Sequence, residues 1–187
     1  MSKFAFDYIV AVFAAVIFTL PFLVITVAVK TSSEGPVFYW SKRVGKAGKF
    51  FMMPKFRSMR SGTPEVATDL LKNPDQYLTF VGSFLRRTSL DELPQLISVL
   101  KGEMSIVGPR PALYSQVDLI SGRRAVGIDL LLPGITGWAQ INGRDDISLS
   151  EKIQLDYEYL QHRNLWLDIK IIYLTALAVM SSRGVSH

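Results

Sequence analysis

The chain contains no cysteine, and its only histidines are His162 and His187. These absences exclude disulfides, zinc–thiolate sites and histidine-rich metal sites. The sequence also lacks the G-x-G-x-x-G and Walker A patterns that mark many nucleotide-binding proteins, and it has no N-x-S/T glycosylation site. Any phosphate or metal chemistry must therefore depend on carboxylates, lysines and arginines.

Positive charge is unevenly distributed along this chain of 187 residues with a formal net charge of +5. Residues 42–60 carry several basic side chains and no acid: Lys42, Arg43, Lys46, Lys49, Lys55, Arg57 and Arg60. Such a stretch suits anionic lipid, a phosphorylated ligand or nucleic acid, or forms a solvated basic face. Because a long apolar run lies just before it, we favour lipid and phosphate and expect no nucleic acid.

The apolar run extends from Tyr8 to Val29 without a charge and is flanked by Asp7 and Lys30. As one helix it would measure ~33 Å, just enough for a hydrocarbon core of ~30 Å. Pro21 interrupts it, and a proline inside a helix usually causes a sharp kink. A spanning helix and a re-entrant helix both remain open, while a secretory signal is disfavoured because the run is too long and lacks a cleavage site.

Periodicity and turn residues after this run predict one mainly helical α+β domain. Val37 to Trp40 and Lys49 to Phe56 are expected to form a short β-hairpin. Residues 61–76 are expected to form a loop that carries a short helix, and residues 133–146 an ordered loop. Helical spacing is found at Tyr77–Arg87, Leu93–Leu100, Ser148–Gln161 and Leu165–Met180. Ser148 and Glu151 have the spacing of a capping box. The predicted organisation is a membrane segment at residues 1–30 and a domain at residues 31–187.

The adjacent carboxylates Asp91 and Glu92 lie just before Pro94, a residue that favours the start of a helix. Helix N-termini stabilise carboxylates and also bind phosphate. Arg86 lies close enough to share an anion with them. An ordinary capping box formed by Ser89 and Glu92 is the alternative interpretation.

Three further segments could bind anions. Arg110 lies between two prolines in "VGPRP", which fix the backbone around a guanidinium suited to phosphate. Lys55 and Arg57 alternate around Phe56, and so share one face of a strand. The segment "NGRDD" adds Asn142, Arg144, Asp145 and Asp146, which could serve a sugar or a metal or could cap the next helix. A Mg²⁺ site stays open, because that ion commonly uses one or two carboxylates and the substrate's phosphates.

Taken together, "KFRSM", "RRTSLDELPQLISVLKGEMSIVGPRP", "PGITGWAQINGR" and "LWLDIKIIYLT" resemble the bacterial sugar transferases, in particular the small monotopic phosphoglycosyl transferases. The resemblance covers nearly the whole chain. It implies a Mg²⁺-dependent enzyme that transfers a sugar 1-phosphate from a UDP-sugar to polyprenyl (undecaprenyl) phosphate and releases UMP, the first membrane step of glycoconjugate assembly. A homodimer is left open.

The same resemblance implies roles for individual residues. Asp91 would attack the sugar-side phosphorus and form an acyl-phosphate intermediate, while Glu92 would help bind Mg²⁺ or manage a proton. Both acids are thus also the expected metal ligands. The other residues assigned to substrate binding are Arg86, Arg110, Lys55, Arg144 and Asp156.

The resemblance also implies a re-entrant helix kinked at Pro21 and a catalytic domain with interfacial helices at the cytoplasmic face of the bacterial inner membrane. Two positions depart from the family pattern. Leu20 replaces the expected small polar residue, although Thr19 could bond the freed carbonyls, and the basic pair near the N-terminus is reduced to Lys3. Two rival functions remain: a catalytically silent lipid-phosphate-binding module and a hydrolase of UDP-sugars.

Overall fold

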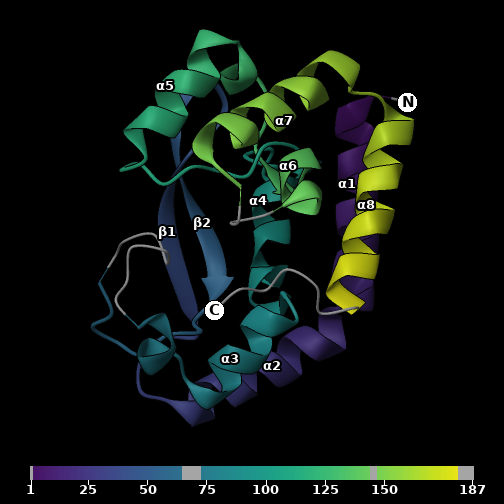
Figure 1. Ribbon diagram of the computed structural model, residues 1–187. Helices are drawn as coiled ribbons and strands as arrows, with labels where there is room; N and C mark the ends of the chain where they lie inside the picture. Colours follow the sequence, from purple (N-terminus) through teal and green to yellow (C-terminus); the bar gives the residue numbers. More distant parts are fainter. Residues whose placement is uncertain (1, 65–72, 144–146, 181–187) are drawn as a thin grey trace.

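Helices dominate the computed structural model, which describes residues 2–64, 73–143 and 147–180 (Figure 1). The α-helices are α1 (Lys3–Ile17), α2 (Thr19–Ser32), α3 (Phe80–Arg87), α4 (Leu96–Leu100), α5 (Val117–Ala125), α6 (Trp138–Asn142), α7 (Leu149–His162) and α8 (Leu165–Met180). The strands are β1 (Phe38–Val44), β2 (Phe50–Phe56), β3 (Ser105–Val107) and β4 (Gly134–Thr136). Short 3₁₀ turns are η1 (Lys46–Gly48), η3 (Pro74–Tyr77), η4 (Leu90–Gln95) and η5 (Ile128–Leu130).

Two small sheets accompany the helices. β1 and β2 form the predicted antiparallel hairpin, with Tyr39 opposite Lys55, while β3 and β4 form a parallel pair. Gly134 permits this pairing, because a Cβ there would collide with the backbone of Gly108. The mainly helical α+β class and the hairpin are confirmed, and β1 extends beyond the predicted Trp40 to Val44.

Several helix boundaries follow local capping. Ser148 and Glu151 form the predicted capping box at the start of α7. α3 begins at Phe80 rather than at the predicted Tyr77, because the Thr79 hydroxyl accepts from the amide of Gly82.

One prediction of local structure is wrong, and one predicted helix starts later than expected. The region 133–146, expected to be a loop, contains β4 and α6 in its described part, because partners distant in sequence satisfy its backbone. The helix predicted at Leu93–Leu100 is present as α4, but it starts at Leu96, because Leu93 belongs to the 3₁₀ turn η4. β3 and α5 had no clear signal in the sequence.

The apolar N-terminal run forms a bent helix pair. In the described parts of the chain no single helix is long and apolar enough to cross a membrane, but α1 and α2 together pass that test and are bent by 62°. The break is at Phe18, next to Ile17, whose carbonyl faces the ring of Pro21 in a continuous helix. The Thr19 hydroxyl donates to the carbonyl of Ala15 at 2.7 Å, so it satisfies a backbone group beside the break.

Each half of this pair packs one face against the protein. Ala11 of α1 joins a core that includes Met53, Val107 and Ile171, whereas Val29 of α2 joins a second core. The opposite faces expose large apolar side chains, among them Phe4, Phe13, Val16, Ile17, Leu20, Leu23, Val24 and Val27. Phe80 and Phe84 of α3 and Trp166 and Tyr173 of α8 are exposed as well. Exposed apolar surface on several elements is typical of membrane or protein contact.

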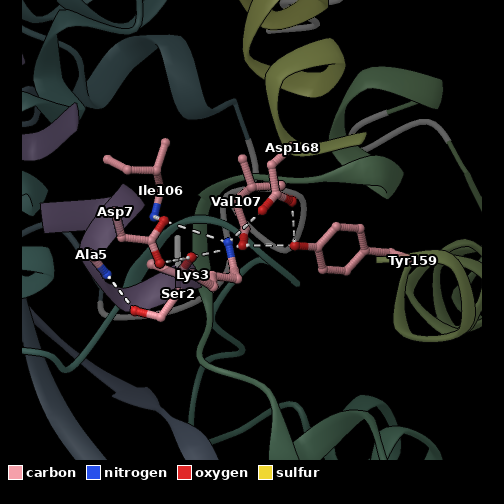
Figure 2. A network of polar contacts seen from close by, with 9 residues as sticks. Ser2, Lys3, Ala5, Asp7, Ile106, Val107, Tyr159 and Asp168 are labelled. Atoms are coloured by element: carbon pink, nitrogen blue, oxygen red, sulfur yellow. Dashed lines mark hydrogen bonds and ion pairs between the residues drawn. The ribbon is translucent and has the colours of Figure 1, made fainter. Parts of the chain in front are cut away.

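A buried carboxylate fixes the start of α1. Figure 2 shows Asp7 pointing from α1 towards β3, where it accepts from the Ser105 hydroxyl at 2.8 Å and the Ile106 amide at 3.2 Å. Since these bonds satisfy both of its oxygens, the charged residue before the apolar run belongs to the protein interior.

A second buried carboxylate links α8 to the same end of α1 (Figure 2). Asp168 pairs with Lys3 at 2.9 Å and accepts from the Tyr159 hydroxyl of α7 at 2.7 Å. Burial, reinforced by Asp168, raises the pKa of Tyr159, which therefore stays a neutral donor. The bent helix pair is thus held to the domain by polar contacts at one end and by apolar packing along its length.

Candidate active site

Asp91 and Glu92 lie on η4, which packs against β2. Ser89, the residue before this turn, has a left-handed backbone (φ 56°) and makes no side-chain capping bond. The capping-box interpretation of Ser89 and Glu92 is therefore wrong. A left-handed serine is costly, and such backbone outliers gather at functional sites.

Glu92 is held by two cations. Its Oε1 lies 2.7 Å from Lys55 Nζ of β2 and 2.9 Å from Arg110 Nη2. Burial alone would raise the pKa of Glu92, but Arg110 and Lys55 outweigh it and hold that pKa well below its usual range. Glu92 therefore favours its ionised form and anchors two basic side chains.

Asp91 differs from Glu92 because none of the basic residues described in the structure is bonded to its carboxylate. It is 7% exposed, and within the described residues no hydrogen bond or ion pair reaches its carboxylate. Burial raises the pKa of Asp91; Lys55 opposes this shift and the neighbouring Glu92 charge adds to it. In its ionised form, a buried carboxylate that accepts no hydrogen bond from the described residues and lies among Lys55, Arg86 and Arg110 can act as a nucleophile or a metal ligand.

We expect the Lys55→Met substitution to raise the pKa of Asp91 further, because it removes a cation that favours the carboxylate form. A ¹³C NMR titration of the aspartate side-chain carboxyls would measure this. Lys49→Met, which removes an exposed lysine just before β2, is the matched control and should leave the Asp91 titration nearly unchanged. A lower Asp91 pKa in Lys55→Met would contradict this electrostatic assignment.

Arg86 lies beside the two acids at the end of α3. Its Nε donates to the Ser58 hydroxyl at 3.1 Å, and Asp91 and Glu92 both act on its charge. Burial lowers the pKa of Arg86, and the two acids partly offset this effect. Arg57, by contrast, donates from Nη2 to the carbonyl and hydroxyl of Ser33, so it closes the end of α2 rather than joining the acids.

These side chains open into a cavity of about 750 Å³. Its described wall carries the acids Asp91 and Glu92 and the basic residues Lys42, Arg43, Lys55, Arg57, Arg60, Arg86, Arg110, Arg123 and Lys152. A strong excess of positive charge around two acids suits a multiply charged phosphate ligand.

Apolar side chains line the rest of the same cavity. They come from α1 and the break that follows it, from η4 and α4, and from α8: Val10, Ala14, Phe18, Leu93, Leu96, Ile172 and Val179. The cavity therefore joins a cationic, carboxylate-bearing part to an apolar part beside the bent helix pair.

The predicted substrate-binding residues separate into three groups. Lys55, Arg86 and Arg110 line the cavity with the acids. Asp156 does not line it: this residue is 1% exposed and pairs with Arg123, so direct contact with substrate is not supported. Arg144 lies outside the described residues.

Arg43 and Arg123 are cavity residues that sequence reasoning did not assign. Arg43 donates to the Ser41 hydroxyl and to the Pro111 carbonyl, and burial together with Arg110 lowers its pKa to about 10. Arg43 already belonged to the basic stretch, whereas Arg123 had no local signal, because Asp156 is distant in the sequence.

The model of the bacterial sugar transferase family matches residues 1–182 of the chain. The chain belongs to this family. It is 39% identical to the "exopolysaccharide production protein ExoY" of Rhizobium meliloti, over 98% of this chain and 88% of that protein.

Two longer relatives have names that state a reaction. The chain is 44% identical to the "UDP-glucose:undecaprenyl-phosphate glucose-1-phosphate transferase" of Xanthomonas campestris, over 98% of this chain and 40% of that protein. It is 40% identical to the "undecaprenyl-phosphate galactose phosphotransferase" of Salmonella typhimurium, over 82% of this chain and 35% of that protein. The chain thus spans well under half of these two relatives.

Proposed function

We propose that the protein transfers a sugar 1-phosphate from a UDP-sugar to polyprenyl phosphate, giving polyprenyl-diphosphate-sugar and UMP. One observation carries the proposal: a single cavity joins the Asp91 and Glu92 site and its cations to an apolar wall formed by α1 and α8. The polar part suits a nucleotide sugar and the apolar part suits the lipid acceptor. The names of the two transferase relatives support the same reaction.

In the first step, a carboxylate oxygen of Asp91 attacks the sugar-side phosphorus of the donor. The new oxygen–phosphorus bond replaces the bond to the bridging oxygen, and that oxygen leaves with its electron pair on UMP. The unbonded state of the Asp91 carboxylate supports this role, because no hydrogen bond among the described residues must be broken first.

In the second step, an oxygen of polyprenyl phosphate attacks the same phosphorus and Asp91 departs as a carboxylate. The enzyme is thereby regenerated. Splitting the transfer keeps the two anionic substrates from having to react with each other directly in one crowded cationic site.

Glu92, Lys55 and Arg110 act together in this scheme. Glu92 accepts from both cations at one oxygen, so it fixes their charged ends beside Asp91. Lys55, Arg110 and Arg86 would then face the diphosphate of the donor and stabilise the charge that moves to the leaving UMP.

The two acids fit Mg²⁺ as a cofactor. The Asp91 carboxylate and the second oxygen of Glu92 accept no hydrogen bond from the described residues, which leaves hard oxygen donors facing the cavity. A group of three or more such ligands is absent from the described residues, in keeping with an ion that takes its remaining ligands from phosphate and water. When bound, Mg²⁺ would screen the charge of the diphosphate.

For α1 and α2, the proposal includes a re-entrant position in the bacterial inner membrane, with the domain at the cytoplasmic face. The 62° bend, the exposed apolar faces of both helices and the basic residues that follow them support it. A nucleotide-sugar donor, which is made in the cytoplasm, requires the same side.

Labelling of a cysteine introduced at Ser2 tests this placement, since the chain has no other cysteine. A membrane-impermeant thiol reagent should label Ser2→Cys in inverted membrane vesicles but not in intact spheroplasts. Labelling in the spheroplasts alone would mean that the run spans the membrane.

The reaction itself is tested with purified protein, Mg²⁺ and a panel of UDP-sugars that includes UDP-glucose and UDP-galactose. We expect continuous UMP release only when polyprenyl phosphate is present, and at most one UMP per enzyme without it. Continuous release without the lipid would indicate the hydrolase. No release with any donor, together with binding of polyprenyl phosphate, would indicate the silent binding module.

A further inference from the structure

The position of Arg110 depends on more than the prolines beside it. Pro109 and Pro111 restrict the backbone locally, but they do not determine where the segment lies relative to Glu92, which Arg110 contacts at 2.9 Å. That placement requires contacts between the segment and the rest of the fold.

Two guanidinium groups hold consecutive carbonyls of this segment. Arg123 of α5 donates from Nη1 to the carbonyl of Arg110 at 2.8 Å, and Arg43 of β1 donates from Nη1 to the carbonyl of Pro111 at 3.1 Å. The donors come from different elements, so together they fix both the position and the orientation of the segment.

Arg123 is itself fixed by Asp156. Its Nε and Nη2 donate to one carboxylate oxygen at 2.9 and 2.6 Å, and both residues are buried. Only the planar fork of an arginine can hold a carboxylate with two nitrogens and aim the third at a carbonyl. A buried ion pair of this kind is a rigid support.

We infer that Arg123 is a positioning residue for the transfer reaction, and that Asp156 acts through it. The Asp156–Arg123 pair places the Arg110 carbonyl, so the Arg110 side chain reaches Glu92 and the donor diphosphate. This inference rests on the proposed function, in which Arg110 binds phosphate, and it gives Asp156 a role without contact to substrate.

A double-mutant cycle separates positioning from a merely structural role. Arg123→Lys keeps a charge beside Asp156 but cannot make all three hydrogen bonds, so kcat/KM should fall by about 10- to 100-fold. In an Arg110→Ala background the same change should cost less than about twofold, because residues that act through one another are non-additive. An equal loss in both backgrounds would overturn the inference.

The neighbouring Arg124 provides the matched control. Arg124 lies on the same helix, but its side chain is exposed, and its ion pair within the described residues is a 3.8 Å contact with Asp129. Arg124→Lys should leave kcat/KM unchanged within about twofold, as is usual for exposed ion pairs. If Arg123→Lys is unfolded at the assay temperature, Asp156→Asn replaces it in the same cycle, since it keeps an acceptor oxygen.

Hydrogen exchange gives a readout independent of activity. The backbone amides of Arg110, Ala112, Leu113 and Tyr114 should exchange faster in Arg123→Lys than in wild type or Arg124→Lys. Unchanged exchange would refute the positioning role even if kcat/KM falls. If wild type transfers no sugar phosphate to any acceptor, the proposed function fails, while the exchange comparison still decides whether Arg123 holds the segment.

Discussion

Asp91→Asn is expected to lower turnover by about 10⁴-fold or more, since removal of a covalent nucleophile abolishes the path through the intermediate. The fold should be retained, because the Asp91 carboxylate holds no partner among the described residues. Steady-state UMP release and the circular dichroism spectrum would be measured together. Asp118→Asn, at an exposed site of α5, is the control and should behave as wild type.

A mass spectrum of the enzyme incubated with a UDP-sugar alone would complete this test. Wild type should gain the mass of one phosphosugar, and Asp91→Asn should gain none. Near-normal turnover in Asp91→Asn would remove Asp91 as the nucleophile. Because burial raises the pKa of Asp91, wild-type activity should decline on the acid side at a higher pH than an ordinary aspartate would dictate.

Asp156→Ala is expected to destabilise the protein by about 3–5 kcal/mol, because it leaves the buried Arg123 guanidinium without a counter-charge. Thermal or denaturant unfolding in detergent would measure the loss. Asp129→Ala, which removes the partly exposed partner of the exposed Arg124, is the control and should cost less than about 1 kcal/mol. Equal losses of unfolding free energy in Asp156→Ala and Asp129→Ala would contradict the role given to the buried Asp156–Arg123 pair.

Removing both charges separates stability from positioning. In the double variant Asp156→Leu, Arg123→Met, much of the stability should return, since apolar residues of similar volume often replace a buried pair at little cost. Activity should remain low, because the carbonyl of Arg110 has lost its donor. Recovery of both stability and activity would mean that the Asp156–Arg123 pair contributes packing volume but does not position the Arg110 segment.

The features that the sequence determined by itself are encoded over a few neighbouring residues. The capping box of Ser148 and Glu151 and the hairpin of β1 and β2 follow from local hydrogen bonding and alternation. Pro21 likewise specifies a break near Ile17, because its ring and missing N–H act on the preceding turn. The adjacency of Asp91 and Glu92, and their resemblance to a family motif, are also visible without a structure.

Only the tertiary structure decided how the two acids differ. Glu92 is anchored because β2 brings Lys55 and the 108–111 segment brings Arg110 to the same oxygen, whereas Asp91 is left unbonded beside them. It also placed Asp156 behind the cavity wall, where it pairs with the wall residue Arg123. These contacts join residues far apart in the chain, and their formation depends on burial and packing of several elements at once, which local sequence patterns do not encode.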